Sequence, residues 1–364
     1  MSGPTPRPGI LDIKPYVPGK SKIDGSAAAM KLSANESALG PSKLAIEAYR
    51  ALSGRLHRYP DGSAQGLRQA IAHRHGLDAA RIVCGAGSDE ILYNLARGYA
   101  GPGDEVLYSE HGFNVYPIVT RAVGAHPVTA PESDLTFDVD AVLARVGART
   151  RLVFIANPNN PTGTYIPADA LARLRAGLRD DIVLVIDSAY AEYVTRNDYS
   201  AGIELVDGGD NTVMTRTFSK IYGLAALRIG WAYCPPAIAD VLDRLRSPFN
   251  LSSAAQAAGT AAMEDSAHVA ASRDHNEVWL PWLSERIKAL GLVVHPSAAN
   301  FILVRFPDDP ARNAAAAMEF FGARGIIPRE TGGYGLPQCL RITIGREDEV
   351  RAVADAVAAF MAGA

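Results

Sequence analysis

The sequence predicts an α/β protein with a larger domain built on a mainly parallel sheet and a smaller α+β domain. Strand-like and helix-like segments alternate from about residue 80 to residue 235, and the chain then turns helical and alanine-rich. Such alternation is typical of βαβ units, in which a helix connects two parallel strands. The length of 364 residues also exceeds what one simple core holds, which favours two domains.

Six short apolar runs in the first part are the expected strands: residues 81–84, 105–108, 152–155, 182–186, 212–215 and 229–233. Gly85-Ala86-Gly87 breaks the first run, and a helix follows it. Two later runs end on polar groups, because one leads directly into Asp187 and another leads to Lys220. In open α/β sheets ligands gather outside the carboxyl ends of the strands, so we expect a binding site there.

The C-terminal part is expected to combine helices with two further strands. Its alanine-rich windows are ordinary helix formers, and they cover residues 252–290 and 311–323. Strand-like runs follow at 300–304 and 340–344, and a last helix ends the chain. Together with residues near the N-terminus, these elements give a smaller α+β domain. The expected segments are an N-terminal arm or lid at residues 1–30, a large domain that holds the site at 31–245 and a small domain at 246–364.

Bulk composition excludes several classes of protein. A net charge of −3 argues against binding of nucleic acid, which needs clustered cationic surface. No apolar run reaches the roughly 18 residues of a membrane span, and the proline- and glycine-rich start shows no signal peptide. Three widely separated cysteines fit neither a disulfide framework nor a metal site, which favours a reducing cytoplasm: Cys84, Cys234 and Cys339.

The residues that could carry chemistry form an ordered series along the chain: Asn160, Asp187, Tyr190, Thr217, Ser219, Lys220 and Arg228. Each alone has an ordinary interpretation, such as a solvated surface lysine or an aspartate that caps a helix. Together they supply what a pyridoxal phosphate (PLP) pocket needs: an amine, a carboxylate for the ring nitrogen, donors for the ring oxygen, and hydroxyls with a guanidinium for the phosphate. This constellation resembles that of the fold-type I aminotransferases.

The resemblance assigns a role to each residue of the series. It makes Lys220 the lysine that bonds the cofactor covalently, and a lysine beside other cations has the lowered pKa that a nucleophile needs. Asp187 would keep the ring nitrogen protonated, while Asn160 and Tyr190 would bond the ring oxygen. We therefore predict that Lys220, Asp187 and Tyr190 are catalytic. The expected phosphate ligands are Thr217, Ser219 and Arg228.

Gly85-Ala86-Gly87-Ser88-Asp89-Glu90, between a strand and a helix, suggests an anion cradle. Glycine lets the backbone approach a phosphate, and free amides at a helix start point at it. We expect Gly87, Ser88 and Asp89 to bind the cofactor, the last two through their backbone amides. The alternative is that Ser88 only caps the helix.

Two aromatic residues also match the family pattern. Phe113 falls where the family places a ring stacked on the cofactor; the alternative is a plain core aromatic. Tyr59, in Arg58-Tyr59-Pro60-Asp61, matches a tyrosine that reaches the phosphate in the neighbouring subunit. The resemblance thus implies a homodimer with Tyr59 contributed across the interface; the alternative is an ordinary turn before a helix.

A narrower resemblance is to the histidinol-phosphate aminotransferase family. The segments that carry it cover nearly the whole chain: residues 11–20, 31–36, 58–61, 87–90 and 296–301. It implies a seven-stranded sheet, PLP as cofactor, and small-molecule substrates, namely histidinol phosphate and glutamate or 2-oxoglutarate. Ser37-Ala38 departs from the family's usual Asn-Pro.

The same resemblance points to three substrate-binding residues: Tyr16, Arg329 and Arg341. Arginine grips carboxylate or phosphate through two parallel hydrogen bonds. Arg341 lies inside an apolar strand, where a cation is costly without an anionic partner. Related activities stay open, because relatives transfer the amino group of aromatic amino acids or decarboxylate phosphothreonine. A non-catalytic PLP-binding regulator is a further alternative, but no helix-turn-helix precedes the matched segments.

Overall fold

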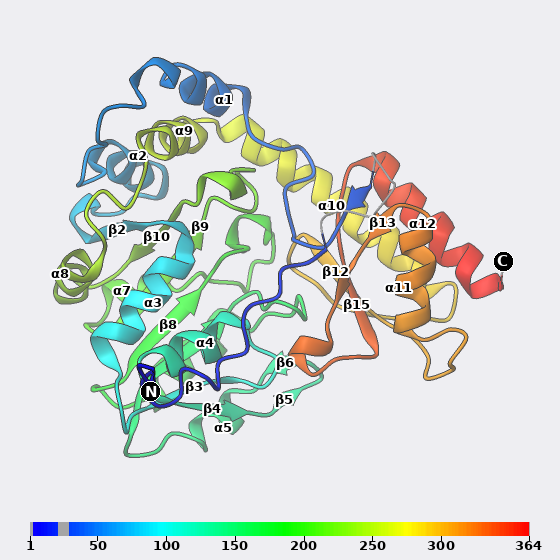
Figure 1. Ribbon diagram of the computed structural model, residues 1–364, viewed down its shortest axis with the longest axis horizontal. Coiled ribbons are helices and arrows are strands. Elements are labelled where there is room, and N and C mark those ends of the chain that lie inside the picture. The colour runs from blue at the N-terminus through cyan, green and yellow to red at the C-terminus, as the bar shows by residue number, and fades with distance from the viewer. Residues whose placement is uncertain (1–2, 21–28, 364) are drawn as a thin grey trace.

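In a computed structural model that describes residues 3–20 and 29–363, the larger part of the molecule is built on a seven-stranded sheet (Figure 1). Neighbouring strands are parallel except β10, which is antiparallel to both of its neighbours. The mainly parallel sheet predicted from the sequence is therefore confirmed. In spatial order the strands are β2 (Ile82–Gly85), β10 (Gly230–Tyr233), β9 (Thr212–Thr217), β8 (Val183–Asp187), β7 (Thr150–Ala156), β3 (Glu105–Ser109) and β4 (His126–Ala130).

Strand β4 has no counterpart among the six runs that the sequence predicted. It reads His-Pro-Val-Thr-Ala and is largely exposed or half-buried, because it lies at the edge of the sheet. Proline is tolerated on an edge strand, where one side of the backbone needs no hydrogen-bond partner. The strand therefore lacks the continuous apolar run by which buried strands are recognised.

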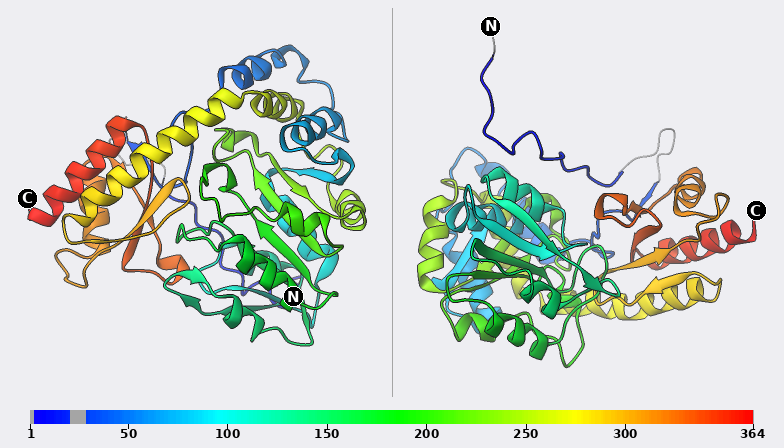
Figure 2. Two further views of the ribbon diagram at one scale, coloured as in Figure 1. Left: turned by 180° about the vertical axis from the view of Figure 1, so that it is seen from behind. Right: turned by 90° about the horizontal axis from the view of Figure 1, so that it is seen from below.

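Helices cover both faces of this sheet, as Figures 1 and 2 show. Leu152 and Phe154 of β7 pack with one layer, which contains α3 (Gly87–Tyr99), α4 (Val115–Ala122) and α8 (Pro236–Leu245). Val153 and Ile155 face the other layer, because successive strand residues point to opposite sides. The second face is covered by α2 (Gln65–His75), α5 (Val139–Leu143), α6 (Ala168–Gly177), α7 (Ile203–Asp207) and α9 (Ser253–Glu264). Helix α1 (Lys43–Arg50) packs on α9, and β5 (Glu132–Ser133) pairs with β6 (Thr136–Phe137).

The smaller part contains a four-stranded antiparallel sheet with a core of its own. Its strands, in spatial order, are β11 (Val293–His295), β12 (Phe301–Arg305), β15 (Cys339–Thr343) and β14 (Arg329–Glu330). Its helices are α10 (Ser266–Lys288), α11 (Ala314–Ala323) and α12 (Glu347–Ala362). Strand β1 (Met30–Lys31) pairs with β13 (Ile326–Ile327), so residues near the N-terminus do join this part.

The helical stretch predicted over residues 252–290 is two helices. Asp265 separates them, because its side chain accepts the backbone N–H of His268 and thereby caps α10. The predicted arm at residues 1–30 lies partly outside the described residues. Its described part, residues 3–20, crosses the face turned to the viewer in Figure 1. The division at residues 30 and 245 stays a prediction.

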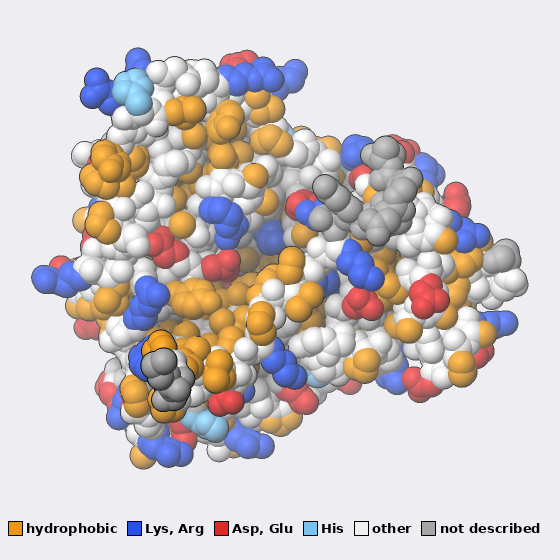
Figure 3. Space-filling view, viewed as in Figure 1, with side chains coloured by type: hydrophobic (Ala, Val, Ile, Leu, Met, Phe, Trp, Pro, Cys, Tyr) orange, Lys and Arg blue, Asp and Glu red, His pale blue; other side chains and the backbone are white. Residues whose placement is uncertain are grey.

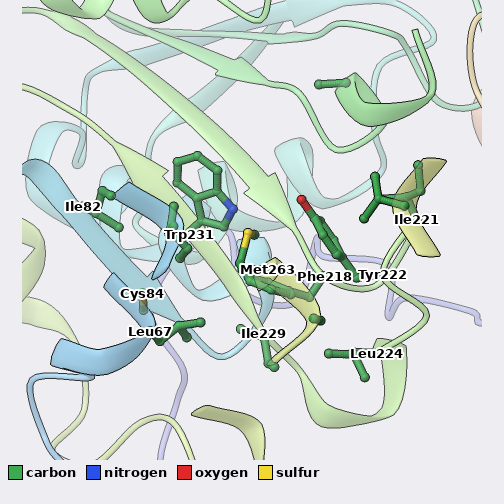
Figure 4. Packing of buried hydrophobic residues seen from close by; sticks show 14 of the residues in the cluster. Leu67, Ile82, Cys84, Phe218, Ile221, Tyr222, Leu224, Ile229, Trp231 and Met263 are labelled. Carbon is green, nitrogen blue, oxygen red and sulfur yellow. The ribbon is translucent and has the colours of Figure 1, made fainter. Parts of the chain in front are cut away.

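The loop after β9 is held by a buried apolar cluster (Figure 4). Phe218 and Tyr222 lie against each other, with ring centroids 4.9 Å apart, and Ile221 and Ile229 are fully buried beside them. Burial of each such side chain stabilises the fold by about 1.5–3 kcal/mol. Residues on both sides of Lys220 are thus fixed in the core.

Among the residues that the structure describes, no helix is long and apolar enough to cross a membrane.

Candidate active site

A cavity of about 250 Å³ lies at the carboxyl ends of β7, β8 and β9 and is lined by residues from both parts of the chain. Figure 3 shows the molecule hollowed near the centre of this face, with cationic and acidic side chains around the hollow. The sequence analysis placed a binding site at this edge of the sheet, where Asp187 and Thr217 end their strands. The predicted residues that line the cavity are Tyr16, Ser88, Asp89, Phe113, Asn160, Asp187, Tyr190, Thr217, Ser219, Lys220, Arg228 and Arg341.

Lys220 presents its amine to this cavity. The Nζ atom donates a hydrogen bond to the backbone oxygen of Ala34 at 3.2 Å and lies 5.6 Å from the centroid of the Tyr190 ring. Burial, and next the charge of Arg341, lower the pKa of Lys220 to about 8. The neutral amine, which a nucleophile requires, is therefore far more populated near neutral pH than in an ordinary lysine.

Asp187 ends β8 as a buried carboxylate with two hydrogen-bond donors. Tyr116 Oη donates to Oδ2 at 3.2 Å, and Thr215 Oγ1 donates to Oδ1 at 3.3 Å. Thr215 can do so because it lies directly opposite Asp187 in the register of β8 and β9. Burial, followed by the charge of Asp89, raises the pKa of Asp187 to about 6. A cationic ligand group beside this carboxylate would keep it ionised.

The start of α3 and the Arg228 side chain form the anion-binding end of the cavity. Arg228 donates to Asp89 Oδ2 at 3.0 Å and to Ser219 Oγ at 3.2 Å. Gly87 has a φ of +78°, and a Cβ atom on it would overlap the Arg228 guanidinium. Glycine is therefore needed here both for its backbone conformation and for space.

The structure decides one alternative about this turn and adds a contact to it. Helix α3 begins at Gly87 and has Ala86 at its N-cap, so Ser88 lies within the first turn and is not the cap. Asp89, which is expected to act through its backbone amide, also pairs with Arg228 through its carboxylate. The first-turn amides of Ser88 and Asp89 have no partner within the helix, as at every helix start.

Two groups at the cavity wall keep free hydrogen-bond donors. Asn160 accepts a hydrogen bond from Arg341 through Oδ1, so its NH₂ group remains for a ligand. Tyr190 accepts one from Asn35 Nδ2 at 2.8 Å, so its O–H remains for a ligand. Burial raises the pKa of Tyr190 to about 12, which keeps this hydroxyl protonated. Phe113 also lines the cavity.

Arg341 is a buried cation in the wall of the cavity. Its side chain donates to Asn160 and to the backbone oxygen of Ser33, and only 4% of the residue is exposed. Its Nε–H has no hydrogen-bond partner, and no carboxylate among the described residues forms an ion pair with it. Burying a guanidinium without an anion is costly, so the arrangement is suited to an anionic ligand.

Three predicted residues do not line the cavity, and one of them is Gly87, which packs against the Arg228 guanidinium. The other two are Arg329 and Tyr59. Arg329 is the register partner of Arg341 on the neighbouring strand, but its Nη2 donates to the backbone oxygen of Val17 at 2.7 Å, beside Tyr16. Tyr59 is 82% exposed and stacks on Phe249, with ring centroids 4.7 Å apart. The single chain therefore brings Arg329 to the edge of the site and leaves Tyr59 outside it.

Sequence reasoning assigned no role to several residues that hold the site together. Tyr116 and Thr215 bond Asp187, while Ser33, Ala34 and Asn35 bond Arg341, Lys220 and Tyr190. The sequence contains a hint for two of these residues. Tyr116 lies only three residues after Phe113, and Asn35 belongs to residues 31–36, a segment that carries the family resemblance.

The fold and this site are those of a fold-type I PLP-dependent transferase. Residues 27–357 match the model of the aminotransferase class I and II family, and the chain belongs to that family, whose cofactor is PLP.

Three relatives narrow the comparison to one kind of aminotransferase. The chain is 60% identical to the histidinol-phosphate aminotransferase of Paramagnetospirillum magneticum over 99% of both chains. It is also 60% identical to that of Rhodospirillum centenum over the full length of both. The histidinol-phosphate aminotransferase of Sinorhizobium meliloti, solved in complex with pyridoxal-5'-phosphate, superposes with a TM-score of 0.89 at 29% identity, covering 100% of this chain and 99% of that one.

The residues present fit PLP by their chemistry. The cavity offers an amine with a lowered pKa at Lys220, a buried carboxylate at Asp187 and free hydrogen-bond donors on Asn160 and Tyr190. Arg228, with the cradle that Gly87 leaves open, supplies an anion site at the far end.

Proposed function

We propose that this protein interconverts L-histidinol phosphate plus 2-oxoglutarate and imidazole-acetol phosphate plus L-glutamate, with PLP as cofactor. The observation that carries the proposal is 60% identity to histidinol-phosphate aminotransferases over the whole chain. It is supported by the set of groups around Lys220, which matches the donors and charges that PLP requires. The activity belongs to histidine biosynthesis.

PLP, when bound, supplies an electron sink for negative charge that develops at the substrate's α carbon. Lys220 would hold the cofactor through its amine, and the same amine would move the proton at that α carbon. Its lowered pKa suits both tasks, because the neutral amine is nucleophile and base. Asp187 would hold a proton on the cofactor's ring nitrogen, and a desolvated carboxylate does this more strongly than one in water.

Asn160 and Tyr190 are assigned to the ring oxygen. The phosphate is assigned to Arg228, Thr217, Ser219 and the first turn of α3 with Gly87, Ser88 and Asp89. Phe113 is assigned to the ring face. Thr217 contributes indirectly as well, since its Oγ1 accepts the backbone N–H of Ser219 at 3.1 Å.

The substrate's anionic groups are assigned to Arg341, Arg329 and Tyr16. Arg341 is the strongest candidate, because it is buried, lines the cavity and has an unpartnered N–H. Glutamate and histidinol phosphate both present anions, so one cationic end can serve both half-reactions.

A substrate comparison tests the proposed function. With 2-oxoglutarate as acceptor, we expect kcat/KM for L-histidinol phosphate to exceed that for L-phenylalanine or L-tyrosine by about 100-fold or more, because an aromatic amino acid offers the arginines of the site its carboxylate but no phosphate. A preference for the aromatic amino acids would replace the proposal by an aromatic aminotransferase. Release of carbon dioxide from phosphothreonine without keto-acid turnover would indicate the decarboxylase.

We also propose a homodimer in which Tyr59 completes the partner's site. Supporting this, Tyr59 and Leu56 are 82% and 79% exposed and lie next to half-exposed Phe249, an apolar surface suited to burial in an assembly. Tyr59 would then donate its hydroxyl to the cofactor phosphate of the other subunit. Each site would consist of residues from two chains.

Mixing a weakened variant with an inactive one tests this arrangement. We expect Tyr59→Ala to lower kcat/KM about 10-fold by removal of one hydrogen bond to a charged group, and Lys220→Ala to be inactive. If equal amounts are co-refolded, half of the dimers carry one intact site, and activity should return to about a quarter of the wild-type value. Activity no higher than the average of the two separate variants would place Tyr59 and Lys220 in the same chain.

We further assign the protein to the cytoplasm, which three free, buried cysteines support. The proposed division is an arm at residues 1–30, a PLP-binding domain at 31–245 and a small domain at 246–364.

A further inference from the structure

The segment Ser33-Ala34-Asn35 contacts three groups of the site at once. The backbone oxygen of Ser33 accepts a hydrogen bond from Arg341 at 2.7 Å, and that of Ala34 accepts one from Lys220 at 3.2 Å. The side chain of Asn35 donates to Tyr190 at 2.8 Å. The bonds at Ser33 and Ala34 use backbone oxygens, which any residue would supply. Only at Asn35 does the segment use a side chain, so only there does the residue type matter directly.

Asn35 is held by four hydrogen bonds in a conformation that non-glycine residues seldom adopt. It is 1% exposed and has a φ of +55°. Its backbone N–H donates to Thr343 Oγ1 at 3.0 Å, and its backbone oxygen accepts from Asn300 Nδ2 at 3.2 Å. A strained backbone conformation persists only where several contacts hold it in place, and such positions concentrate at functional sites.

Thr343 favours the orientation of the Asn35 amide in which the NH₂ group faces Tyr190. The Thr343 hydroxyl already accepts the backbone N–H of Asn35, and it donates its one proton to Asn35 Oδ1 at 3.2 Å. The amide oxygen is thereby fixed toward Thr343, and the NH₂ group is fixed toward Tyr190. Asn35 therefore acts as a donor to the tyrosine oxygen.

The hydrogen bond donated by the Asn35 amide leaves the proton of the Tyr190 hydroxyl free. A phenol has one proton and accepts through its oxygen, so a phenol that already accepts from Asn35 has its own proton free for another group. Had the amide oxygen faced Tyr190, that proton would have been taken within the protein. The cavity, which Tyr190 lines, is where the free proton can find an acceptor.

We propose that Asn35 is a positioning residue that fixes the Tyr190 hydroxyl as a hydrogen-bond donor to the ring oxygen of PLP. The inference rests on the proposed function, because that acceptor belongs to the cofactor. The bond donated by Tyr190 favours the ionised ring oxygen.

The charged groups around Tyr190 act alongside this bond. Burial raises the pKa of Tyr190, and Arg341 and the Asn35 amide act in the opposite direction, while Asp187 adds to the rise. Lys220 lies over the ring, and Phe301 packs edge-on against it with centroids 5.4 Å apart. All of these stay in place when only the Asn35 amide is changed.

Replacement of Asn35 by aspartate reverses the bond with almost no change in size, because a carboxylate only accepts. The readout is the pH midpoint of the visible absorbance of bound PLP, which changes as the cofactor–lysine linkage loses its proton. Since a bond donated to the ring oxygen favours the ionised form, its loss raises this midpoint. We expect Tyr190→Phe and Asn35→Asp each to raise the midpoint by about one pH unit.

Two further variants separate orientation from charge. Thr343→Val removes the hydroxyl that orients the amide, adds no charge and does not touch Tyr190, so a smaller upward shift is expected. In Asn35→Asp/Tyr190→Phe the hydroxyl is absent, so the double variant should shift no more than Tyr190→Phe alone. Asn276→Asp is the control for burying a carboxylate, because Asn276 is also buried and donates to a backbone oxygen, that of Ala299; it should leave the midpoint unchanged.

The outcomes separate this inference from the proposed function. Additive shifts in the double variant would mean that Asn35→Asp acts through its charge. An unchanged midpoint in Thr343→Val would mean that the orientation of the Asn35 amide does not matter. Either result would overturn the inference. If Asn35→Asp fails to fold, as judged by thermal melting, Thr343→Val decides alone. Failure of the wild-type protein to bond PLP would instead reject the proposed function.

Discussion

Lys220→Ala should lower kcat/KM for amino transfer by about 10⁴-fold or more, because it removes the nucleophile and the base together. The same variant should lose covalent attachment of PLP, measured by borohydride reduction and intact mass. Its thermal melting temperature without cofactor should not fall, since a desolvated amine that donates only to the Ala34 oxygen contributes little to folding.

Lys31 provides a matched control for this result. It also lines the cavity, but its amine forms an ion pair with Glu36 at 2.7 Å and about a third of its side chain is exposed. Lys31→Ala should keep the covalent label. Loss of the label in Lys31→Ala and its retention in Lys220→Ala would exchange the roles of the two lysines.

Asp187→Asn should lower kcat/KM by about 10²–10⁴-fold, because an amide cannot hold a proton on the cofactor's ring nitrogen as a carboxylate does. The dissociation constant of PLP should rise as well, measured by fluorescence titration. Asp207→Asn is a control: that carboxylate pairs with Arg81 at 2.7 Å and does not line the cavity, so activity should be retained. Undiminished turnover in Asp187→Asn would contradict the assigned role.

The pH dependence of the stability of the cofactor-free protein provides a second test of Asp187. Burial raises the folded-state pKa of this carboxyl from its ordinary value to about 6, so the folded state binds a proton more tightly than the unfolded state. The contribution of Asp187 to stability is therefore present at low pH and is lost as pH rises toward 6. Urea titration of the cofactor-free protein should show that the wild type, compared with Asp187→Asn, becomes less stable over this range.

The parts of the fold and site that local patterns specify were predictable. Buried strands are continuous apolar runs, and a polar group at the end of such a run must emerge at the ligand-binding edge, as Asp187 does. Lys220, Asn160 and Arg228 were found because each lies in a local motif. Strand β4 was missed because an edge strand needs no apolar run, and the break between α9 and α10 depends on a single cap at Asp265.

The residues that the sequence left without a role are those that act through distant partners. Asn35 bonds Tyr190 across 155 positions and Thr343 across 308, so no local pattern reports either contact. In the sequence Tyr116 resembles an ordinary core residue of a helix, and only the fold places its hydroxyl next to Asp187. Tyr59 is the opposite case, since its motif was visible but its expected partner lies on another chain.

Peptide mapping after borohydride reduction of the protein with PLP tests the central claim most directly. The proposed mechanism predicts one reduced pyridoxyl phosphate label per chain, on the peptide that contains Lys220. A label on Lys31, on another lysine or on no peptide would contradict it.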